Sequence, residues 1–83
     1  MDLTNQVINL VGSVLSLGER TAKLTANSAL LGAIPELDSM AVVSLLTSIE
    51  EKFGVVIADD EVDGRTFASV GSLVTFVDGK LRG

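Results

Sequence analysis

One apolar stripe in the middle of the chain constrains the fold more than any other feature. Four apolar side chains recur there at the spacing of a single helical face: Val42, Leu46, Ile49 and Phe53. Asp38 precedes the stripe at the position of an N-cap, where a carboxylate accepts hydrogen bonds from the free amides of the first turn. The pattern predicts an amphipathic helix from about Ser39 to Lys52, with Gly54 as its stop.

Ser39 is the expected first residue of this helix, and its hydroxyl is expected to face outward at the positive end of the helix dipole. A phosphate attached to that hydroxyl would be stabilised by the dipole. An aspartate–serine pair at a helix start is common, and its simplest interpretation is a cap followed by a surface serine. The pair therefore depends on its surroundings for any functional meaning.

A second helix is predicted near the start of the chain, over residues 4–17. Its apolar stripe consists of Leu3, Val7, Leu10, Val11, Val14 and Leu17. Thr4 is the expected N-cap, and Gly18 is the expected C′ residue that ends the helix. Gly12 inside this segment costs about 1 kcal/mol relative to alanine, which indicates either close helix packing or a tolerated loss.

A last helix is predicted from a cap at Ser69 to about Leu81. Its apolar side consists of Val70, Leu73, Val74, Phe76 and Val77. The acidic run 59–64 before it is consistent with one short helical turn. The same run has the acid spacing of a calcium-binding loop, but its twelfth position is Val70, where such loops need a bidentate glutamate. Calcium is therefore disfavoured.

The remaining segments are predicted to be irregular. Residues 18–37 form an unusually long connection, in which residues 19–24 can form one helical turn. Its expected anchors onto the core are Leu24, Leu30, Leu31 and Ile34. Residues 55–57 favour a strand by propensity but have no partner strand, and a lone strand leaves its backbone groups unsatisfied. They are therefore predicted to be an extended connector with side chains inserted into the core.

Composition limits the chemistry. The chain has 83 residues, enough for one domain, and contains neither cysteine nor histidine. Disulfides, thiolate metal sites and nucleophiles paired with histidine are thereby excluded. Its lysines have no feature that would make one of them a base for Ser39, so hydrolysis at this serine is disfavoured.

Charge and hydropathy limit the classes of partner and the cellular location that are expected. The net charge of −5 and pI near 4.3 disfavour nucleic acid and anionic membranes as partners. They suit basic protein partners, or serve solubility alone. The N-terminus has no signal-peptide pattern and no apolar run has transmembrane length, so a cytoplasmic location is expected.

Taken together, these segments resemble the acyl carrier protein family, including its peptidyl carrier relatives, over nearly the whole chain. The matching segments are the loop 31–36, Leu37-Asp38-Ser39-Met40, Ile49-Glu50-Glu51-Lys52-Phe53-Gly54, Val55-Val56-Ile57, the acidic short helix, Thr66-Phe67-Ala68-Ser69-Val70 and the last amphipathic helix. The resemblance implies an all-α fold, a small acyl-carrier-like bundle of three main helices plus one short helix with a long first loop. Residues 1–83 would be a single carrier domain and a monomer.

The resemblance also implies a chemistry. A phosphopantetheinyl transferase would attach 4′-phosphopantetheine from coenzyme A to Ser39. The terminal thiol of that arm would carry an acyl or aminoacyl group as a thioester, so a cysteine-free protein could take part in thiol chemistry. Asp38 would hold the helix start and help to present Ser39 to the transferase and its magnesium. The carrier itself would have no catalytic residue and bind no metal of its own.

Further partners implied by the resemblance are an acyl-loading ligase or acyltransferase and downstream synthases, recognised through Met40, Glu50 and Glu51. Fatty-acid carriers usually have acids soon after the serine, where this chain has Ala41 and Ser44. Thr47 also replaces a larger apolar residue. These departures favour a specialised biosynthetic pathway over housekeeping fatty-acid synthesis.

An alternative interpretation needs no prosthetic group. In it the chain is a non-catalytic helical bundle for protein interaction, and Ser39 is a surface residue beside a cap. Incubation with coenzyme A and a transferase separates the two interpretations.

Overall fold

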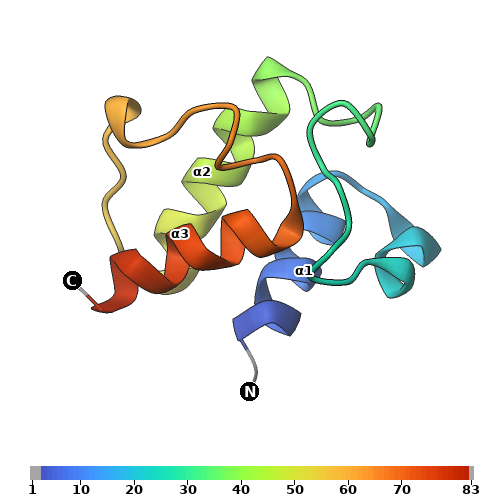
Figure 1. The fold of residues 1–83 in the computed structure, drawn as a ribbon, viewed down its shortest axis with the longest axis horizontal. Helices are drawn as coiled ribbons and strands as arrows, with labels where there is room; N and C mark the ends of the chain where they lie inside the picture. Colours follow the sequence, from blue (N-terminus) through green and yellow to red (C-terminus); the bar gives the residue numbers. More distant parts are fainter. Residues whose placement is uncertain (1–2, 83) are drawn as a thin grey trace.

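The computed structural model describes residues 3–82 and has the all-helical architecture that the sequence predicts (Figure 1). The elements in this range are the α-helices α1 (Leu3–Val14), α2 (Ser39–Phe53) and α3 (Val70–Arg82) and the 3-10 helices η1 (Gly18–Lys23) and η2 (Asp59–Glu61). η2 is the predicted short helix, and η1 is the turn expected within the long first connection. None of the helices in this range is long and apolar enough to cross a bilayer.

The core lies between α1 and the other two long helices. α1 packs against both α2 and α3. The side chains that are completely buried come from these three helices and from one loop leucine: Val7, Val11, Leu30, Leu45, Ile49, Val70, Leu73 and Val77. All of them are aliphatic, so the bundle is held together by apolar burial, the main favourable term in folding.

α1 ends earlier than predicted, and Gly18 is not its C′ residue. Ser16 ends the helix in the left-handed region with a φ of 55°, and Gly18, which also has a positive φ of 57°, begins η1. The Leu17 amide donates to the Gly12 carbonyl at 2.9 Å, and the Ser16 amide donates to the Ser13 carbonyl at 3.3 Å. This pair of bonds is the Schellman arrangement, with serine where glycine is usual. The predicted N-cap was also wrong, because Thr4 lies inside α1.

Gly12 is explained by close packing. A Cβ atom at this position would lie 2.8 Å from the Cβ of Thr21 in η1, closer than two such atoms approach. The missing side chain therefore lets η1 lie directly against α1. Of the two explanations open from the sequence, the structure supports this one.

The long connection is fastened to the start of α3 by backbone hydrogen bonds. They join the Leu30 amide to the Ala68 carbonyl, the Leu31 amide to the Phe67 carbonyl, the Val70 amide to the Ser28 carbonyl and the Gly71 amide to the Ala26 carbonyl, at 2.8–3.0 Å. Leu30 is fully buried and Leu24 and Ile34 are half-buried, as predicted for anchors. Leu31 was predicted wrongly, because 45% of it is exposed.

α2 matches its prediction closely. The carboxylate of Asp38 accepts a hydrogen bond from the Ala41 amide at 2.8 Å, which confirms it as the N-cap. Gly54 ends the helix in the left-handed region with a φ of 68°. Leu45 is fully buried although it lies beside the predicted stripe, because α2 packs with a wider apolar side than a single row.

The connector after α2 follows its prediction in part. Val55 and Ile57 pack against the core, but Val56 is 80% exposed and therefore does not enter it. The Ile57 amide donates to a carboxylate oxygen of Glu50 at 2.8 Å. This bond fastens the connector to the last turns of α2.

Candidate functional site

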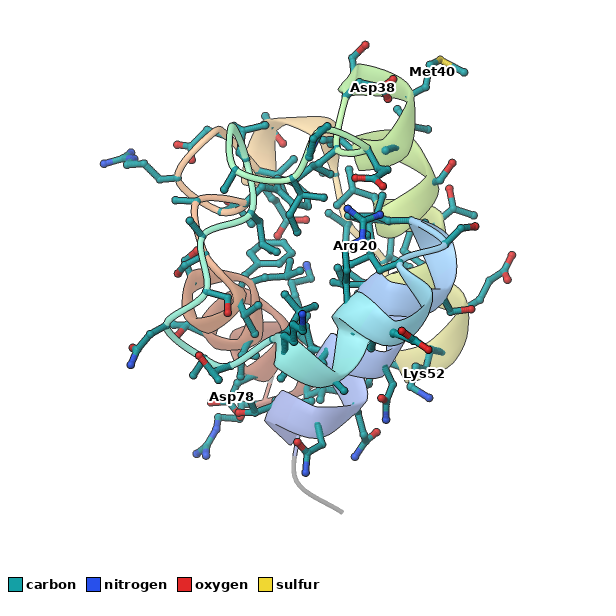
Figure 2. The ribbon with its side chains drawn as sticks, turned by 90° about the vertical axis from the view of Figure 1, so that its right-hand side faces the viewer. Arg20, Asp38, Met40, Lys52 and Asp78 are labelled. Atoms are coloured by element: carbon teal, nitrogen blue, oxygen red, sulfur yellow. The ribbon has the colours of Figure 1, made fainter. Side chains whose placement is uncertain are left out.

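The start of α2 projects from the body of the molecule. Figure 1 shows it at the upper edge, away from α1 and the C-terminal end of α3. Figure 2 shows Asp38 and Met40 together at this end, with Lys52 and Asp78 toward the opposite one. Asp38 has an extended backbone, with φ −111° and ψ −172°, so the chain turns sharply into the helix at Ser39.

Ser39 is exposed at the first helical position. Its hydroxyl has no hydrogen-bond partner among the residues that the structure describes. The Asp38 carboxylate is occupied by the Ala41 amide, whereas the amides of Ser39 and Met40, at the first two helical positions, have no acceptor within the helix. The site therefore combines an accessible hydroxyl with backbone donors and the positive end of a helix dipole, which suits an attached phosphate.

The loop that leads into Asp38 is held by an ion pair. Arg20 of η1 forms a bidentate ion pair with the Glu36 carboxylate. One of its two hydrogen bonds runs from Arg20 Nη1 to Glu36 Oε1 at 3.2 Å, and the other runs from Nη2 to Oε2. This hydrogen-bonded guanidinium holds the pKa of Glu36 below its ordinary value, and the same contact raises the pKa of Arg20. The pair links η1 to the residue two positions before the cap.

An apolar pocket is lined in part by the first turn of α2. It has a volume of about 200 Å³ and is lined by Leu31, Val42, Val62, Asp63, Gly64 and Phe67. Val42 comes from the first turn of α2, so the pocket is close to the site in the fold. The sequence did not identify it, because its walls come from three segments far apart in the chain.

The three residues predicted to contact partners have different environments. Met40 is 74% exposed beside Ser39. Glu50 is half-buried and bound to the Ile57 amide, whereas Glu51 is exposed near the other end of α2. The structure therefore places only Met40 next to the serine.

Val43 is a residue that the sequence reasoning missed. It is 59% exposed on the outer side of α2, one turn from Met40. The signal was available, because Val43 is an apolar residue outside the predicted core stripe of α2.

Comparison with known proteins places this geometry in a family. A family model described as "Phosphopantetheine attachment site" matches residues 5–77. The holo acyl carrier protein of Nitrosomonas europaea, solved in solution by NMR, is 52% identical, covers 100% of both chains and superposes with a TM-score of 0.91. An acyl carrier protein from Beutenbergia cavernae is 39% identical over 44 residues, 53% of this chain and 51% of that protein. The match therefore spans about half the length of this curated relative.

The chain thus belongs to the phosphopantetheine-attachment family and, within it, to the acyl carrier proteins. Its cofactor is covalently attached 4′-phosphopantetheine. The residues at the start of α2 fit this group, because the serine hydroxyl is exposed and has no partner among residues 3–82, while the neighbouring amides have no acceptor within the helix and can face a phosphate.

Proposed function

We propose that the chain carries acyl or aminoacyl intermediates as thioesters on a 4′-phosphopantetheine arm attached to Ser39. The observation that carries this proposal is the exposed Ser39 hydroxyl at the start of a capped helix, where no described residue forms a hydrogen bond with it. The arm supplies the thiol that this cysteine-free chain lacks. The chain itself has no catalytic role in the proposal and serves as the substrate of other enzymes.

The attachment step uses the Ser39 oxygen as the nucleophile. That oxygen attacks the phosphorus of coenzyme A that bears the pantetheine, and a new phosphorus–oxygen bond forms. The pyrophosphate bond breaks and adenosine 3′,5′-bisphosphate leaves. In this proposal the hydroxyl proton passes to a base on the transferase, and the chain has no histidine that could take that role. Asp38 holds the helix start rigid while Ser39 reacts.

A specialised pathway remains our preferred setting for this carrier. From Ser39 to Ile49 the sequence has no charged side chain, so the first turns of α2 lack the acids expected of a general fatty-acid carrier. Partners under this proposal are a phosphopantetheinyl transferase, an acyl-loading enzyme and downstream synthases. Inefficient loading by a general malonyl transferase is the expected result, and efficient loading would contradict the specialised role.

The central test is mass spectrometry of the intact apo protein after incubation with coenzyme A, magnesium and a broad-specificity transferase. The wild-type chain should gain one phosphopantetheine, and Ser39→Ala should gain none. Ser13→Ala is the matched control, because Ser13 is also an exposed helical serine but lies on α1 and should not affect the gain. An unmodified wild-type chain would favour the alternative of an interaction bundle without a prosthetic group.

A further inference from the structure

A second pocket lies beside η1, and two cations line it. It has a volume of about 240 Å³, and we call it the η1 pocket. Its cations are Arg20 and Lys23, both from η1. Residues three apart in a 3-10 helix lie one above the other, so these two side chains share one side of η1. The other walls of the pocket are apolar and consist of Leu17, Leu24, Ala33, Ile34 and Pro35. The η1 pocket therefore combines apolar walls with positive charge on one side.

Lys23 supplies the net positive charge of the η1 pocket. Arg20 is paired with Glu36, which balances its charge but occupies only two of the five N–H donors of a guanidinium. Lys23 has no ion pair with any side chain that the structure describes. Apart from Lys23 and Lys52, every side-chain cation in the described range is paired with a carboxylate. An unpaired cation beside apolar walls, in a chain of net charge −5, favours an anionic ligand that also has an apolar part.

The pocket at the first turn of α2 has charge of the opposite sign. Its charged lining residue is the carboxylate of Asp63. Asp63 is paired with Arg65 at 3.2 Å, but the Arg65 side chain is 93% exposed and does not line the pocket. A carboxylate placed there would be repelled by Asp63, whereas an uncharged chain would not. The two pockets therefore differ in the end group that they favour.

The η1 pocket is within reach of an arm on Ser39. Pro35 lines the pocket and lies four residues before Ser39. Their Cα atoms are therefore no more than about 15 Å apart, because consecutive Cα atoms are ~3.8 Å apart. An extended phosphopantetheine arm spans a longer distance. In Figure 2, Arg20 lies closer to Asp38 than Lys52 does. Tethering gives a group on the arm a roughly millimolar effective concentration, which compensates for the weak binding of exposed cations.

We propose that the cargo of this carrier is an acyl group with a carboxylate at its far end, and that the η1 pocket holds this end while the cargo is on the arm. The carboxylate contacts the ammonium of Lys23 and the remaining donors of Arg20. The methylene groups of the cargo pack against Leu17, Leu24 and Ile34. This inference rests on the proposed function and names a cargo class for it. Cargo with an uncharged end gains no ionic contact here, so the pocket distinguishes cargo by its end group.

The test compares two arms with the same number of carbon atoms. A broad-specificity transferase attaches the loaded arm from adipyl-coenzyme A or from hexanoyl-coenzyme A, so the two proteins differ only in a terminal carboxylate or methyl group. Amide NMR spectra of the two nitrogen-labelled proteins should differ most at residues 20–24 and 33–34, which surround the η1 pocket. A carbon label on the terminal carboxyl group gives its pKa, which should be lower on the wild-type chain than on Lys23→Gln. A nearby cation favours the ionised form of a carboxyl group.

Lys23 is the most informative position to vary, because no described side chain depends on it for an ion pair. Lys23→Gln should remove most of the spectral difference between the two arms. Lys23→Glu should abolish that difference, and Lys23→Arg should retain it. Lys52→Gln is the matched control, because Lys52 also has no carboxylate partner in the described range but lies toward the opposite end of the molecule (Figure 2). This control should leave the difference unchanged, and circular dichroism should show each variant folded.

Three outcomes would overturn the inference while leaving the carrier function intact. One is that the adipyl and hexanoyl arms give the same amide signals around the η1 pocket. Another is an adipyl-specific change centred on residues 62–67, which would place the cargo end in the pocket beside α2. A third is an equal loss for Lys52→Gln and Lys23→Gln, which would indicate long-range charge and not contact. A wild-type chain that accepts neither arm would instead reject the proposed function itself.

Discussion

The starts of α2 and α3 have the same chemical ingredients and use them differently. Each helix begins after a capping side chain, Asp38 in one case and Ser69 in the other, and each has a serine close by. At α3 the Ser72 amide donates to the Ser69 hydroxyl at 3.1 Å, and the Ser69 amide donates to the Ser72 hydroxyl at 3.0 Å. At α2 the Ser39 hydroxyl has no partner within the described part of the chain.

The backbone amides differ in the same way. The Val70 and Gly71 amides at the start of α3 donate to carbonyls of the long connection, at 2.9 and 2.8 Å. The corresponding amides of α2 lack acceptors within the helix. The start of α3 is therefore a structural junction, whereas the start of α2 keeps its donors and its hydroxyl available. A hydroxyl at a helix start indicates function only when the fold leaves it unused.

The largest expected effect of a substitution is at the α3 junction. Leu30→Ala should destabilise the chain by about 2–5 kcal/mol, because Leu30 is fully buried where the connection meets α3. The neighbouring Leu31→Ala should cost about 1 kcal/mol or less, since Leu31 is nearly half exposed. Urea unfolding followed by circular dichroism measures both. Equal losses would show that the junction is not the tightly packed region.

Two glycines in α3 allow the packing at the junction to be tested by adding a methyl group at each position. A Cβ at Gly71 would lie 2.9 Å from the Ala26 carbonyl oxygen, whereas a Cβ at Gly79 would have no neighbour within 4 Å in the described part of the chain. Gly71→Ala should therefore cost about 1–3 kcal/mol through overpacking. Gly79→Ala should stabilise by up to about 1 kcal/mol through helix propensity. Opposite shifts of the urea midpoint support the comparison, and two stabilising shifts would contradict it.

Serine-to-alanine substitutions at the two helix starts compare a hydroxyl that caps a helix, that of Ser69, with the exposed hydroxyl of Ser39. Ser69→Ala should cost about 1 kcal/mol, because it removes the cap of α3. Ser39→Ala should change the free energy of unfolding by no more than about 0.5 kcal/mol, as is usual for an exposed residue. If Ser39→Ala proved the more destabilising of the two, its hydroxyl would have a structural use after all.

Asp38 connects stability to the proposed chemistry. Asp38→Ala should cost about 1 kcal/mol by loss of the cap. It should also slow the attachment of phosphopantetheine, because Ser39 would then lie on a frayed turn. Asp38→Asn keeps an oxygen acceptor and should restore most of the stability. Urea unfolding and intact-mass rates for both variants distinguish the cap from the charge.

The sequence predicted α2 well because its signals are local. Asp38 begins the helix and Gly54 ends it, and both act through side-chain or backbone chemistry at their own positions. The same local signals located Ser39 as an exposed hydroxyl. α1 was less predictable, since it ends at a serine in the left-handed region, Ser16, before the chain reaches Gly18, which also has a positive φ.

The errors about burial in the irregular segments arise because no periodicity there assigns a side chain to a face. Leu31 and Val56 are apolar residues in irregular segments, and both are more exposed than predicted. The backbone pairing of the connection with α3 has no side-chain signature at all. The pocket beside the site was also missed, because it forms only when distant segments meet.

The smallest effect on stability is expected from breaking either of two ion pairs. One pair precedes α2 and the other involves α3, so the two helices can also be compared through the pH dependence of stability. Arg20 binds Glu36 just before α2, and Lys80 of α3 binds Glu61 of η2 at 2.8 Å. In each pair the hydrogen-bonded cation lowers the pKa of the glutamate. A lowered folded-state pKa contributes stability above the ordinary glutamate pKa, and this contribution is lost as the pH falls through the folded-state value.

Both contributions should therefore be present at neutral pH and disappear in acid. NMR titration of the carboxyl carbons should show the pKa of Glu36 rising toward its ordinary value in Arg20→Gln, with Glu61 unaffected. Lys80→Gln should do the reverse.

Glu36 lies two residues before Asp38, in the loop that leads into the proposed attachment site. Arg20→Gln should therefore also make this loop less rigid and slightly slow the attachment of phosphopantetheine to Ser39. The control is Arg82→Gln, which should leave the attachment rate unchanged, because its ion pair with Asp78 lies toward the end of the molecule opposite to Asp38 (Figure 2). A Glu36 pKa that stayed low without Arg20 would mean that backbone groups, and not the ion pair, hold the segment before α2.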